Sequence, residues 1–474
     1  MPLIIPANTL SGGYEVANSC RFNRPDSAYM SKTQGSGNRR KATFSTWIKG
    51  QHAGYAEQMI MSSGGNMNIY TDSGSLRINT GTGDYAYSTA LYRDPSAWYH
   101  FCVAIDTEQG VAANRIKIYV NGTQVTVFSA SGDPSEDEDL NMNLTGETFY
   151  ISKSAGSSYG DYYLAETVWI DGLQLAPTSF GEFDEDSPTI WKPIDVSGLT
   201  FGTNGFYLDF EASDNLGNDA NGGTDLTEVN LAATDQSLDS PTNNFAVPNI
   251  LLDGIDMSYG ENNLEIVIGT DAQYGTQSSI GMTAGKWYME LKHTANTSAG
   301  NDRVMVGIVG NPAHLATCGI SPSINIASGY IGSNSEPTSY GYYSDSGTSY
   351  NNDVSSSYGD TWTLNDIIGI YLDCDNNKLY FSKNGTVQNS GTGISITAPA
   401  STAAGAYFFG FSDTSSYGGT VQVNFGGASC YSNSSSVSDA NGFGSFEYSP
   451  SGTFDGASKD FLALCTKNLG SDGG

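Results

Sequence analysis

The residues in this chain best suited to chemistry are tyrosines that stand beside asparagine and aspartate in Gly/Ser-rich stretches. Tyrosine rings stack on the CH-rich faces of sugar rings, and Asn, Asp and Tyr side chains bond sugar hydroxyls. Three stretches combine these residue types, at residues 84–92, 159–163 and 340–353. The side chains expected to contact a carbohydrate or a protein partner are Tyr340, Tyr342, Tyr343, Asp345, Tyr350, Asn351, Tyr85, Tyr87 and Tyr162.

These tyrosines have a second interpretation, in which they pack loops or join subunits. Loops rich in Tyr, Ser and Gly serve many kinds of binding surface, so composition alone does not name a ligand. Both interpretations stay open at this point. Residues 340–353 are the strongest single stretch for binding, because they combine four tyrosines with asparagine and aspartate.

Metal chemistry has weaker support in the sequence. The six cysteines are widely spaced and the four histidines include no pair four residues apart, so a zinc site is not expected. Calcium prefers carboxylate oxygens, and an acidic loop at residues 131–139 offers Asp133, Asp137 and Asp139 as weak ligand candidates. A solvated acidic surface explains the same residues more simply, and we expect no obligatory cofactor.

The charge balance excludes several classes of partner. The chain has 50 acidic and 20 basic residues, a formal net charge of −30, which repels nucleic acid phosphates and anionic membranes. The first ten residues, MPLIIPANTL, contain no basic residue and no long apolar core, so we expect no signal peptide. No stretch reaches the apolar length of a membrane span. We expect a soluble protein that is made in a cytoplasm.

The elements that must position these residues are β-strands. Residues 366–372 and 378–383 form apolar runs that are separated by a polar turn and followed by Asn384-Gly385. An Asn-Gly pair suits a tight type I′ turn, because both central residues need a positive φ. Residues 98–106 and 115–120, followed by Asn121-Gly122, repeat the same pattern. The sequence therefore predicts an all-β protein with two jelly-roll or β-sandwich domains in series, joined by an irregular connector.

Changes in composition predict the domain boundaries. The connector is expected where the chain becomes rich in Asn, Asp and Gly with little to bury. The predicted parts are an N-terminal arm at 1–15, a first sandwich at 16–200, a connector at 201–249, a second sandwich at 250–428 and a Gly/Ser-rich segment at 429–474.

The first domain resembles the laminin-G-like, concanavalin A-type jelly roll. Four short motifs occur in the order and spacing of that family over roughly residues 14–200. They are FSTWIK at 44–49, WYHF at 98–101, IYVNG at 118–122 and LAETVWIDG at 164–172.

The second domain resembles a SPRY-type β-sandwich over roughly residues 250–428. The resemblance implies that partners bind through loops at one end of the sandwich, which favours residues 340–353. The matching motifs are GKWYME at 285–290, VGIV at 306–309, DIIGIYLD at 366–373, LYFSKNG at 379–385 and YFFGF at 407–411.

Over nearly its full length the chain is also similar to two-module virion proteins of tailed phages, especially marine ones. The opening IPANTLSGGYEVANSCRFN and the close NGFGSFEYSP...FLALCTKNL carry this resemblance. It implies a non-enzymatic fibre, appendage or decoration protein on the virion surface, made in the host cytoplasm. Its partners would be other capsid or tail proteins, anchored through Leu3, Ile4 and Ile5, and host-surface glycans; a homo-oligomer is expected, with a trimer suiting a fibre.

Two alternatives remain. One is a purely structural capsid or tail decoration protein that binds no ligand. The other is a glycoside hydrolase, because concanavalin A-type jelly rolls include glucanases. A retaining hydrolase needs two carboxylates about 5–5.5 Å apart, and such enzymes resemble Glu-x-Asp-x-x-Glu. The nearest match starts at Glu182, but Ser187 takes the place of the last acid and Pro188 would disturb a central strand. We therefore expect no enzyme.

Overall fold

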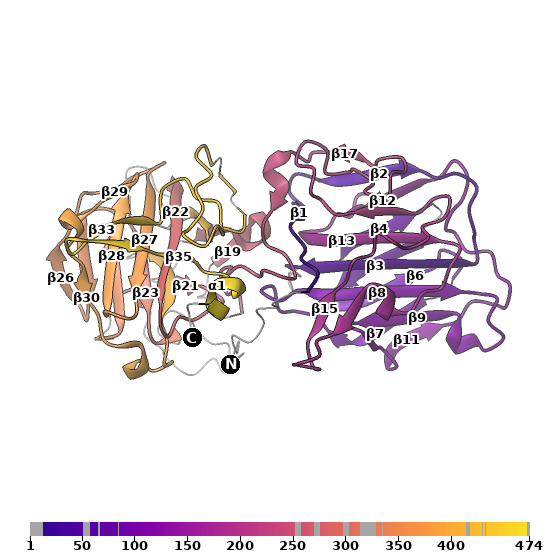
Figure 1. The fold of residues 1–474 in the computed structure, drawn as a ribbon, viewed down its shortest axis with the longest axis horizontal. Helices are drawn as coiled ribbons and strands as arrows, with labels where there is room; N and C mark the ends of the chain where they lie inside the picture. The colour runs from indigo at the N-terminus through magenta and orange to yellow at the C-terminus, as the bar shows by residue number, and fades with distance from the viewer. Residues whose placement is uncertain are drawn as a thin grey trace. The chain divides into compact units, whose positions relative to one another are not determined.

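The computed structural model describes residues 13–50, 57–64, 67–83, 85–251, 257–269, 275–296, 303–312, 329–333, 335–413, 418–428, 430–431 and 433–471. The chain divides into two compact units, the N-terminal unit Leu10–Asn243 and the C-terminal unit Asn244–Gly474 (Figure 1). Each unit is built mainly from antiparallel strand pairs, so the predicted all-β class with sandwiches in series is confirmed. The arm residues Leu3, Ile4 and Ile5 lie outside the described residues.

Two eight-stranded sheets form the N-terminal unit. The back sheet runs, in spatial order, through β10 (Thr123–Gln124), β9 (Ile116–Val120), β8 (Tyr99–Asp106), β3 (Lys41–Lys49), β13 (Tyr162–Asp171), β1 (Ser19–Phe22) and β18 (Gln236–Ser237), with β16 (Phe206–Leu208) also on β13. The front sheet runs through β11 (Phe128–Gly132), β7 (Tyr85–Leu91), β6 (Ser75–Asn79), β5 (Met67–Asp72), β4 (Gln58–Ser63), β12 (Thr148–Ile151), β2 (Tyr29–Thr33) and β17 (Thr227–Val229).

The two faces of the front sheet differ in chemistry. Its inner face supplies Met30, Ile69, Ile78 and Ile151 to the core between the sheets. Because side chains alternate along a strand, the residues between them point outward. Successive Cα partners on this outer face, from β17 to β7, form a row of hydroxyl, amide and tyrosine side chains: Thr227, Ser31, Tyr150, Ser62, Asn68, Asn79 and Tyr85.

The outer face of the back sheet is apolar and covered. Val168 and Ile170 of β13 pack there against Phe180, Val196 and Phe201. These three residues come from the chain that follows β13, which also contains η2 (Pro177–Ser179) and the hairpin of β14 (Gly181–Phe183) and β15 (Trp191–Pro193). The front sheet therefore carries the more polar outer surface of this unit.

The segment expected to be a connector, residues 201–249, is instead largely part of the N-terminal unit. Its strands β16, β17 and β18 pair with β13, β2 and β1. Leu208, Phe210, Leu216 and Leu226 lie in the core between the two sheets. Apolar residues spaced singly among Asn, Asp and Gly are enough to fix this segment, because each one fills a site in an existing core.

The C-terminal unit is a sandwich of a nine-stranded and a six-stranded sheet. The first runs through β19 (Met257–Gly260), β20 (Glu265–Ile268), β32 (Gly419–Asn424), β22 (Lys286–Asn296), β27 (Ile367–Asp373), β28 (Lys378–Lys383) and β29 (Thr386–Val387), with β30 (Ile394–Ser395) on β28 and β35 (Leu462–Ala463) on β22. The second runs through β21 (Gly275–Gln277), β31 (Phe408–Asp413), β23 (Val304–Val309), β24 (Ser339–Tyr343), β25 (Thr348–Asn351) and β26 (Val354–Ser357).

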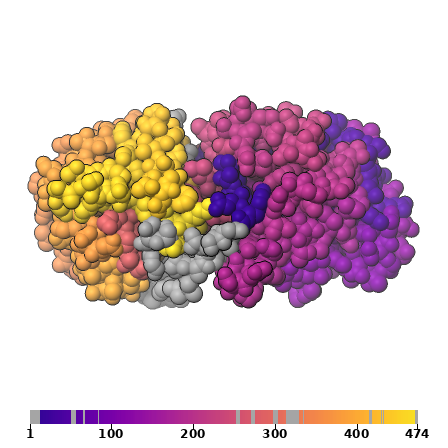
Figure 2. Space-filling model, in the orientation of Figure 1, coloured from indigo at the N-terminus to yellow at the C-terminus, as the bar shows by residue number. Residues whose placement is uncertain are grey.

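The segment predicted as a Gly/Ser-rich end, 429–474, forms a third layer on the nine-stranded sheet. Phe446, Phe454 and Phe461 of this segment pack on Tyr288 and Tyr371 of the sheet. Figure 2 shows the segment in yellow across the visible face of the unit. It contains the hairpin of β33 (Ser451–Phe454) and β34 (Ala457–Asp460), the strand β35, and α1 (Thr466–Ser471).

Both predicted Asn-Gly turns are confirmed. Asn121 and Gly122 have φ of 47° and 74°, and Asn384 and Gly385 have φ of 48° and 78°. The remaining short elements are the 3-10 turns η1 (Ala112–Asn114), η3 (Ala233–Asp235), η4 (Glu261–Asn263), η6 (Asn389–Gly391) and η7 (Pro399–Ser401). Across the described residues, no helix has the length and apolar character needed to cross a bilayer.

Candidate functional site

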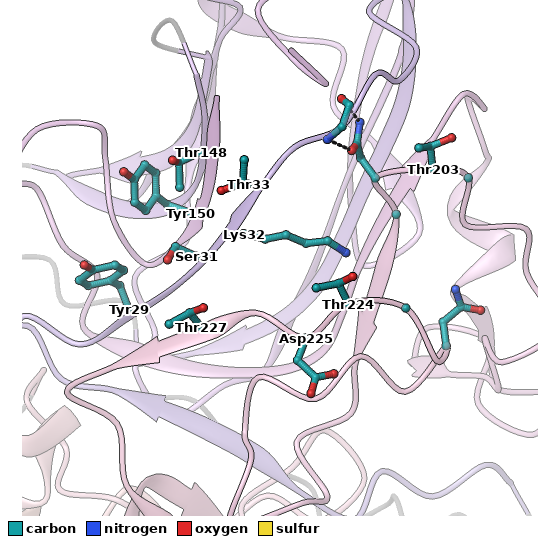
Figure 3. Close-up of a pocket in the computed structure, with 16 residues that line it drawn as sticks. Tyr29, Ser31, Lys32, Thr33, Thr148, Tyr150, Thr203, Thr224, Asp225 and Thr227 are labelled. Atoms are coloured by element: carbon teal, nitrogen blue, oxygen red, sulfur yellow. Dashed lines mark hydrogen bonds between the residues drawn. The ribbon is translucent and has the colours of Figure 1, made fainter. Parts of the chain in front are cut away.

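An open cavity of about 730 Å³ lies beside β2 in the N-terminal unit (Figure 3). We call it the β2 groove. Strands β2, β12 and β17 and the turns at 202–205 and 221–225 supply its walls. The lining residues are Tyr29, Ser31, Lys32, Thr33, Gly35, Thr148, Tyr150, Gly202, Thr203, Asn204, Gly205, Asn221, Gly223, Thr224, Asp225 and Thr227.

Two tyrosines form an aromatic end of the groove. The ring centroids of Tyr29 and Tyr150 lie 6.0 Å apart, with the rings nearly edge to face. Lys153 Nζ lies 4.2 Å from the centroid of Tyr29 and 5.1 Å from that of Tyr150. Tyr159 contacts Tyr29 with a centroid distance of 6.3 Å. Because these contacts fix both rings, the tyrosines lose little additional freedom when a ligand packs against them.

Charged groups lie at the other end of the groove. In Figure 3, Lys32 extends toward Thr224. Burial lowers the pKa of Lys32, and the neighbouring carboxylates of Asp219 and Asp225 act in the opposite direction. The Asp225 carboxylate accepts hydrogen bonds from Asn215 Nδ2 at 2.9 Å and from the Asp219 backbone N–H at 3.1 Å. The hydrogen bond from Asn215 is the main reason that its pKa is lowered.

The turn at 202–205 is held tightly against its neighbours. Asn204 Oδ1 accepts from the Gly35 backbone N–H at 2.7 Å, and Asn204 Nδ2 donates to the Gly35 carbonyl at 3.1 Å. Gly202 has a φ of 80°, and a Cβ there would lie 2.1 Å from the Asp171 carbonyl oxygen. Only glycine suits both requirements. This wall of the groove is therefore preorganised by contacts within the protein.

The lining favours recognition of a polar ligand over catalysis. Five threonine hydroxyls, amide groups and one amine offer both donors and acceptors. The lining contains one carboxylate, Asp225, whereas glycoside hydrolysis uses a pair. Among the described residues, no group of three or more His, Cys, Asp or Glu side chains is placed to hold a metal ion.

Four of the tyrosines predicted to bind a ligand are in fact buried. Tyr342 and Tyr162 are fully buried in the two cores, and Tyr340 and Tyr343 are 5% and 8% exposed. The stretch 340–353 was expected to bind partners through a loop, but residues 340–343 form the central strand β24, whose tyrosine rings pack with Phe381, Tyr407 and other side chains. Residues this deeply buried cannot stack on a sugar, so the predicted role of these four is wrong in this structure.

The other predicted binding residues are at least partly exposed but do not line the β2 groove. Tyr85 and Tyr87 lie on the outer face of β7, 5.1 Å apart between ring centroids, and Arg77 packs over Tyr87 at 4.8 Å. Asp345 is exposed in the β24–β25 turn. Tyr350 and Asn351 lie on β25, where Asn351 Nδ2 donates to the carbonyls of Pro337 and Ser339.

Two of the three weak calcium candidates are ion-paired with an arginine. Arg40 donates to Asp139 Oδ1 at 2.8 Å and to Asp137 Oδ1 at 3.1 Å. Asp133 is exposed in the same loop. The acidic loop therefore offsets the basic Arg39-Arg40 pair, which lies beside it.

Neither of two arrangements that could suggest catalysis has the geometry for it. Glu182 and Asp184 are both ion-paired with Lys192 at 3.3 Å in the β14–β15 hairpin. His100 is fully buried; Trp191 Nε1 donates to its Nδ1 at 3.1 Å, so its Nε2 carries the proton and faces Ser45 Oγ at 2.8 Å. Since Nε2 is then a donor, His100 cannot take a proton from Ser45.

The residues of the groove were missed in the sequence because they belong to strands and not to tyrosine-rich loops. A signal was present, since Tyr29-Met30-Ser31 and Phe149-Tyr150-Ile151 alternate between apolar and polar or tyrosine side chains. Such alternation indicates one face toward a core and one toward solvent. It does not reveal that β2 and β12 are neighbours, which is what brings Tyr29 and Tyr150 together.

Two family models match this chain. The concanavalin A-like lectin/glucanases superfamily, as a laminin G domain, matches residues 25–163, and the SPRY domain matches residues 286–427. No curated protein matches.

Several solved structures are similar to parts of this chain. The SPRY domain of human HERC1 is 18% identical, with 34% of this chain and 87% of that chain covered and a TM-score of 0.25. A Bacteroides ovatus ATCC 8483 protein, solved as a candidate carbohydrate binding protein, is 17% identical, with 47% and 63% covered and a TM-score of 0.32. The TRIM65 PSpry domain is 13% identical, with 40% and 90% covered and a TM-score of 0.28. From the two family matches, the chain carries a concanavalin A-like, laminin G-type domain followed by a SPRY domain.

Proposed function

We propose that this protein is a non-enzymatic virion protein of a tailed phage, exposed on the particle, and that it binds host-surface carbohydrate in the β2 groove. The observation that carries the carbohydrate proposal is the lining of the groove. Two fixed tyrosine rings stand at one end, and hydroxyl, amide and charged side chains line the rest. Sugars need both an apolar surface for their ring faces and polar groups for their hydroxyls.

The family match supports the same assignment. The concanavalin A-like model spans residues 25–163 and so includes the groove residues of β2 and β12. Residues 202–227, which complete the groove, lie beyond the matched region. The ligand preference is therefore expected to depend on this chain's own additions to the family fold.

The virion part of the proposal rests on the sequence resemblance and the charge. A net charge of −30 suits a protein that is exposed at high local density on a particle, because like charges oppose aggregation. In this proposal the arm with Leu3, Ile4 and Ile5 docks to a capsid or tail protein, and the assembled form is a homo-oligomer, with a trimer suiting a fibre.

A matched pair of tyrosine variants tests the groove. Tyr150 lies in the groove and Tyr85 lies outside it, and both are on the outer face of the front sheet. The full chain, Tyr150→Ala and Tyr85→Ala are each applied to a glycan array after their folds have been compared by circular dichroism. We expect Tyr150→Ala to weaken glycan binding at least tenfold and Tyr85→Ala to retain it, since stacking on the Tyr150 ring would be lost.

The other outcomes have clear meanings. Loss of binding in Tyr85→Ala alone would move the site to β7 and overturn the groove assignment. Absence of glycan binding by the unaltered chain would overturn the carbohydrate proposal and favour a purely structural decoration protein. Antibody labelling of intact particles in the electron microscope tests the virion proposal: fibre-tip label supports host recognition, capsid label supports decoration, and no label on any particle refutes it.

A further inference from the structure

A buried carboxylate oxygen beside the β2 groove accepts no hydrogen bond from the described residues. The Asp219 side chain is fully buried, and its Oδ1 accepts from the backbone N–H groups of Tyr207 and Asn221 at 3.0 and 3.1 Å. Within the described part of the chain, its second oxygen, Oδ2, has no hydrogen-bond partner. A buried carboxylate oxygen without a partner is costly, so such an atom points to a group that binds there.

A cation that faces this oxygen is Lys32 on the groove wall. Lys32 Nζ lies 3.9 Å from Asp219 Oδ2, which is close enough for electrostatic attraction but too far for a hydrogen bond. The Lys32 side chain is 11% exposed, and its charged end also lies 5.9 Å from the centroid of the Phe206 ring. The N–H groups of Lys32 Nζ can therefore donate to a ligand atom that lies beside Asp219 Oδ2.

Gly223 lies directly against the Asp219 carboxylate. A Cβ on Gly223 would lie 2.2 Å from Asp219 Oδ2 and 3.3 Å from its Cγ. Gly223 itself lines the groove. Any side chain at this position would press on the carboxylate, so only glycine allows the groove lining to lie this close to Oδ2.

We infer that the ligand of the β2 groove is a neutral saccharide, one hydroxyl of which lies between Lys32 Nζ and Asp219 Oδ2. A hydroxyl accepts from an ammonium group through its oxygen and donates to a carboxylate through its hydrogen. Two groups 3.9 Å apart can both lie about 2.8 Å from a single oxygen atom between them. This inference rests on the proposed carbohydrate binding. It adds the class of sugar and the two residues that hydrogen-bond to its hydroxyl.

The local charge favours a neutral sugar over an acidic one. The single positive charge of Lys32 faces the carboxylates of Asp219 and Asp225. An acidic sugar would bring a further negative charge to a site where carboxylates already outnumber cations, and like charges in a partly buried site repel strongly. A hydroxyl meets no such penalty and satisfies the buried oxygen.

The first test compares sugar classes with the unaltered full chain. It is applied to an array of neutral glycans and of glycans that carry carboxylate or sulfate groups. We expect binding to be confined to neutral glycans, and mono-deoxy analogues of the best binder to show one hydroxyl whose loss lowers affinity at least tenfold. Preferred binding of acidic glycans would overturn the inference while leaving carbohydrate binding intact.

Substitutions then identify the residues. Asp219→Asn keeps Oδ1 and the size of the side chain but replaces the acceptor Oδ2 with a donor, and Asp214→Asn removes one exposed carboxylate away from the groove. We expect Asp219→Asn to lower affinity at least tenfold for the full sugar and to have little further effect on the critical deoxy analogue; Asp214→Asn should bind normally.

Lys32→Gln provides a second variant if Asp219→Asn does not fold. It removes the cation without adding bulk and should show the same dependence on the deoxy analogue. Unchanged affinity in folded Asp219→Asn or in Lys32→Gln would overturn the inference. Absence of binding to any glycan by the unaltered chain would instead refute the proposed function on which it rests, so the two failures are distinguishable.

Discussion

Glu166 is a buried acid whose protonation should make the stability of the N-terminal unit depend on pH. It sits at a bulge in β13 with a φ of 48°, is 5% exposed, and accepts from Tyr207 Oη at 2.8 Å and Tyr14 Oη at 3.2 Å. Burial raises the pKa of Glu166 from 4.5 to about 8, and the two tyrosine hydrogen bonds oppose the rise. The folded protein therefore keeps a proton that the unfolded chain releases above pH 4.5.

This difference makes stability depend on pH in a defined direction. Because the folded state binds the extra proton, the free energy of unfolding declines as pH rises from 4.5 to 8. The loss amounts to about 3 kcal/mol at pH 7 and about 5 kcal/mol above pH 8. Glu166→Gln keeps an oxygen for Tyr207 and cannot ionise, so it should show none of this decline.

The measurement is hydrogen exchange of the full chain, followed by mass spectrometry of peptides from β13 between pH 5 and 8.5. Exchange rates are corrected for their intrinsic dependence on pH. We expect Glu166→Gln and the parent protein to be similarly protected at pH 5 and to diverge steadily, with the variant more protected, at higher pH. Glu185→Gln, which changes an exposed acid in the same unit, serves as the control. Parallel pH profiles for Glu166→Gln and the parent would refute the reasoning.

Three further predictions concern buried groups. Tyr342→Ala should destabilise the C-terminal unit by about 3–5 kcal/mol, since it empties a fully buried site, and urea unfolding should show the loss. Glu290→Ala removes the carboxylate that accepts from the Tyr448 backbone N–H at 2.6 Å, so peptides of residues 431–448 should gain hydrogen exchange while those of β24 change little. Lys49→Met leaves the buried Asp239 without the ammonium group 2.5 Å away and should lower the thermal midpoint of the N-terminal unit, at a cost of about 3–5 kcal/mol; an unchanged midpoint would show that the pair adds no net stability.

The fold was predictable because its signals are local. Apolar alternation, Asn-Gly turns and short family motifs are each contained in a few neighbouring residues, and the strands they predict are present in both units. The segment from 201 to 249 was not recognised as part of a sandwich, because Leu216 and Leu226 are isolated in a polar sequence and the short run at 206–210 does not reveal which strand it pairs with. Their role depends on a core supplied by strands far earlier in the chain.

The candidate site was harder to predict because it depends on which strands are neighbours. Tyr342 and Tyr29 both stand in short polar sequences, yet Tyr342 is buried beneath Phe381 and Tyr358 while Tyr29 lines a groove. Nothing in the adjacent residues separates the two cases. Tyr29 lines the groove because β2 pairs with β12 and β17. A single sequence does not reveal which strands pair.

The third layer on the C-terminal unit also has a consequence for synthesis. Strand β35 joins β22 in parallel, with Leu462 beside Trp287, and the aromatic residues around it cover Tyr288 and Tyr371. A ribosome completes the sandwich strands through β32 before residues 446–465 leave the exit tunnel. During that interval the nascent chain exposes an aromatic sheet face, and such a surface can bind chaperones or associate with neighbouring nascent chains. The yield of this protein should therefore depend on how quickly residues 446–465 are translated after the sandwich strands.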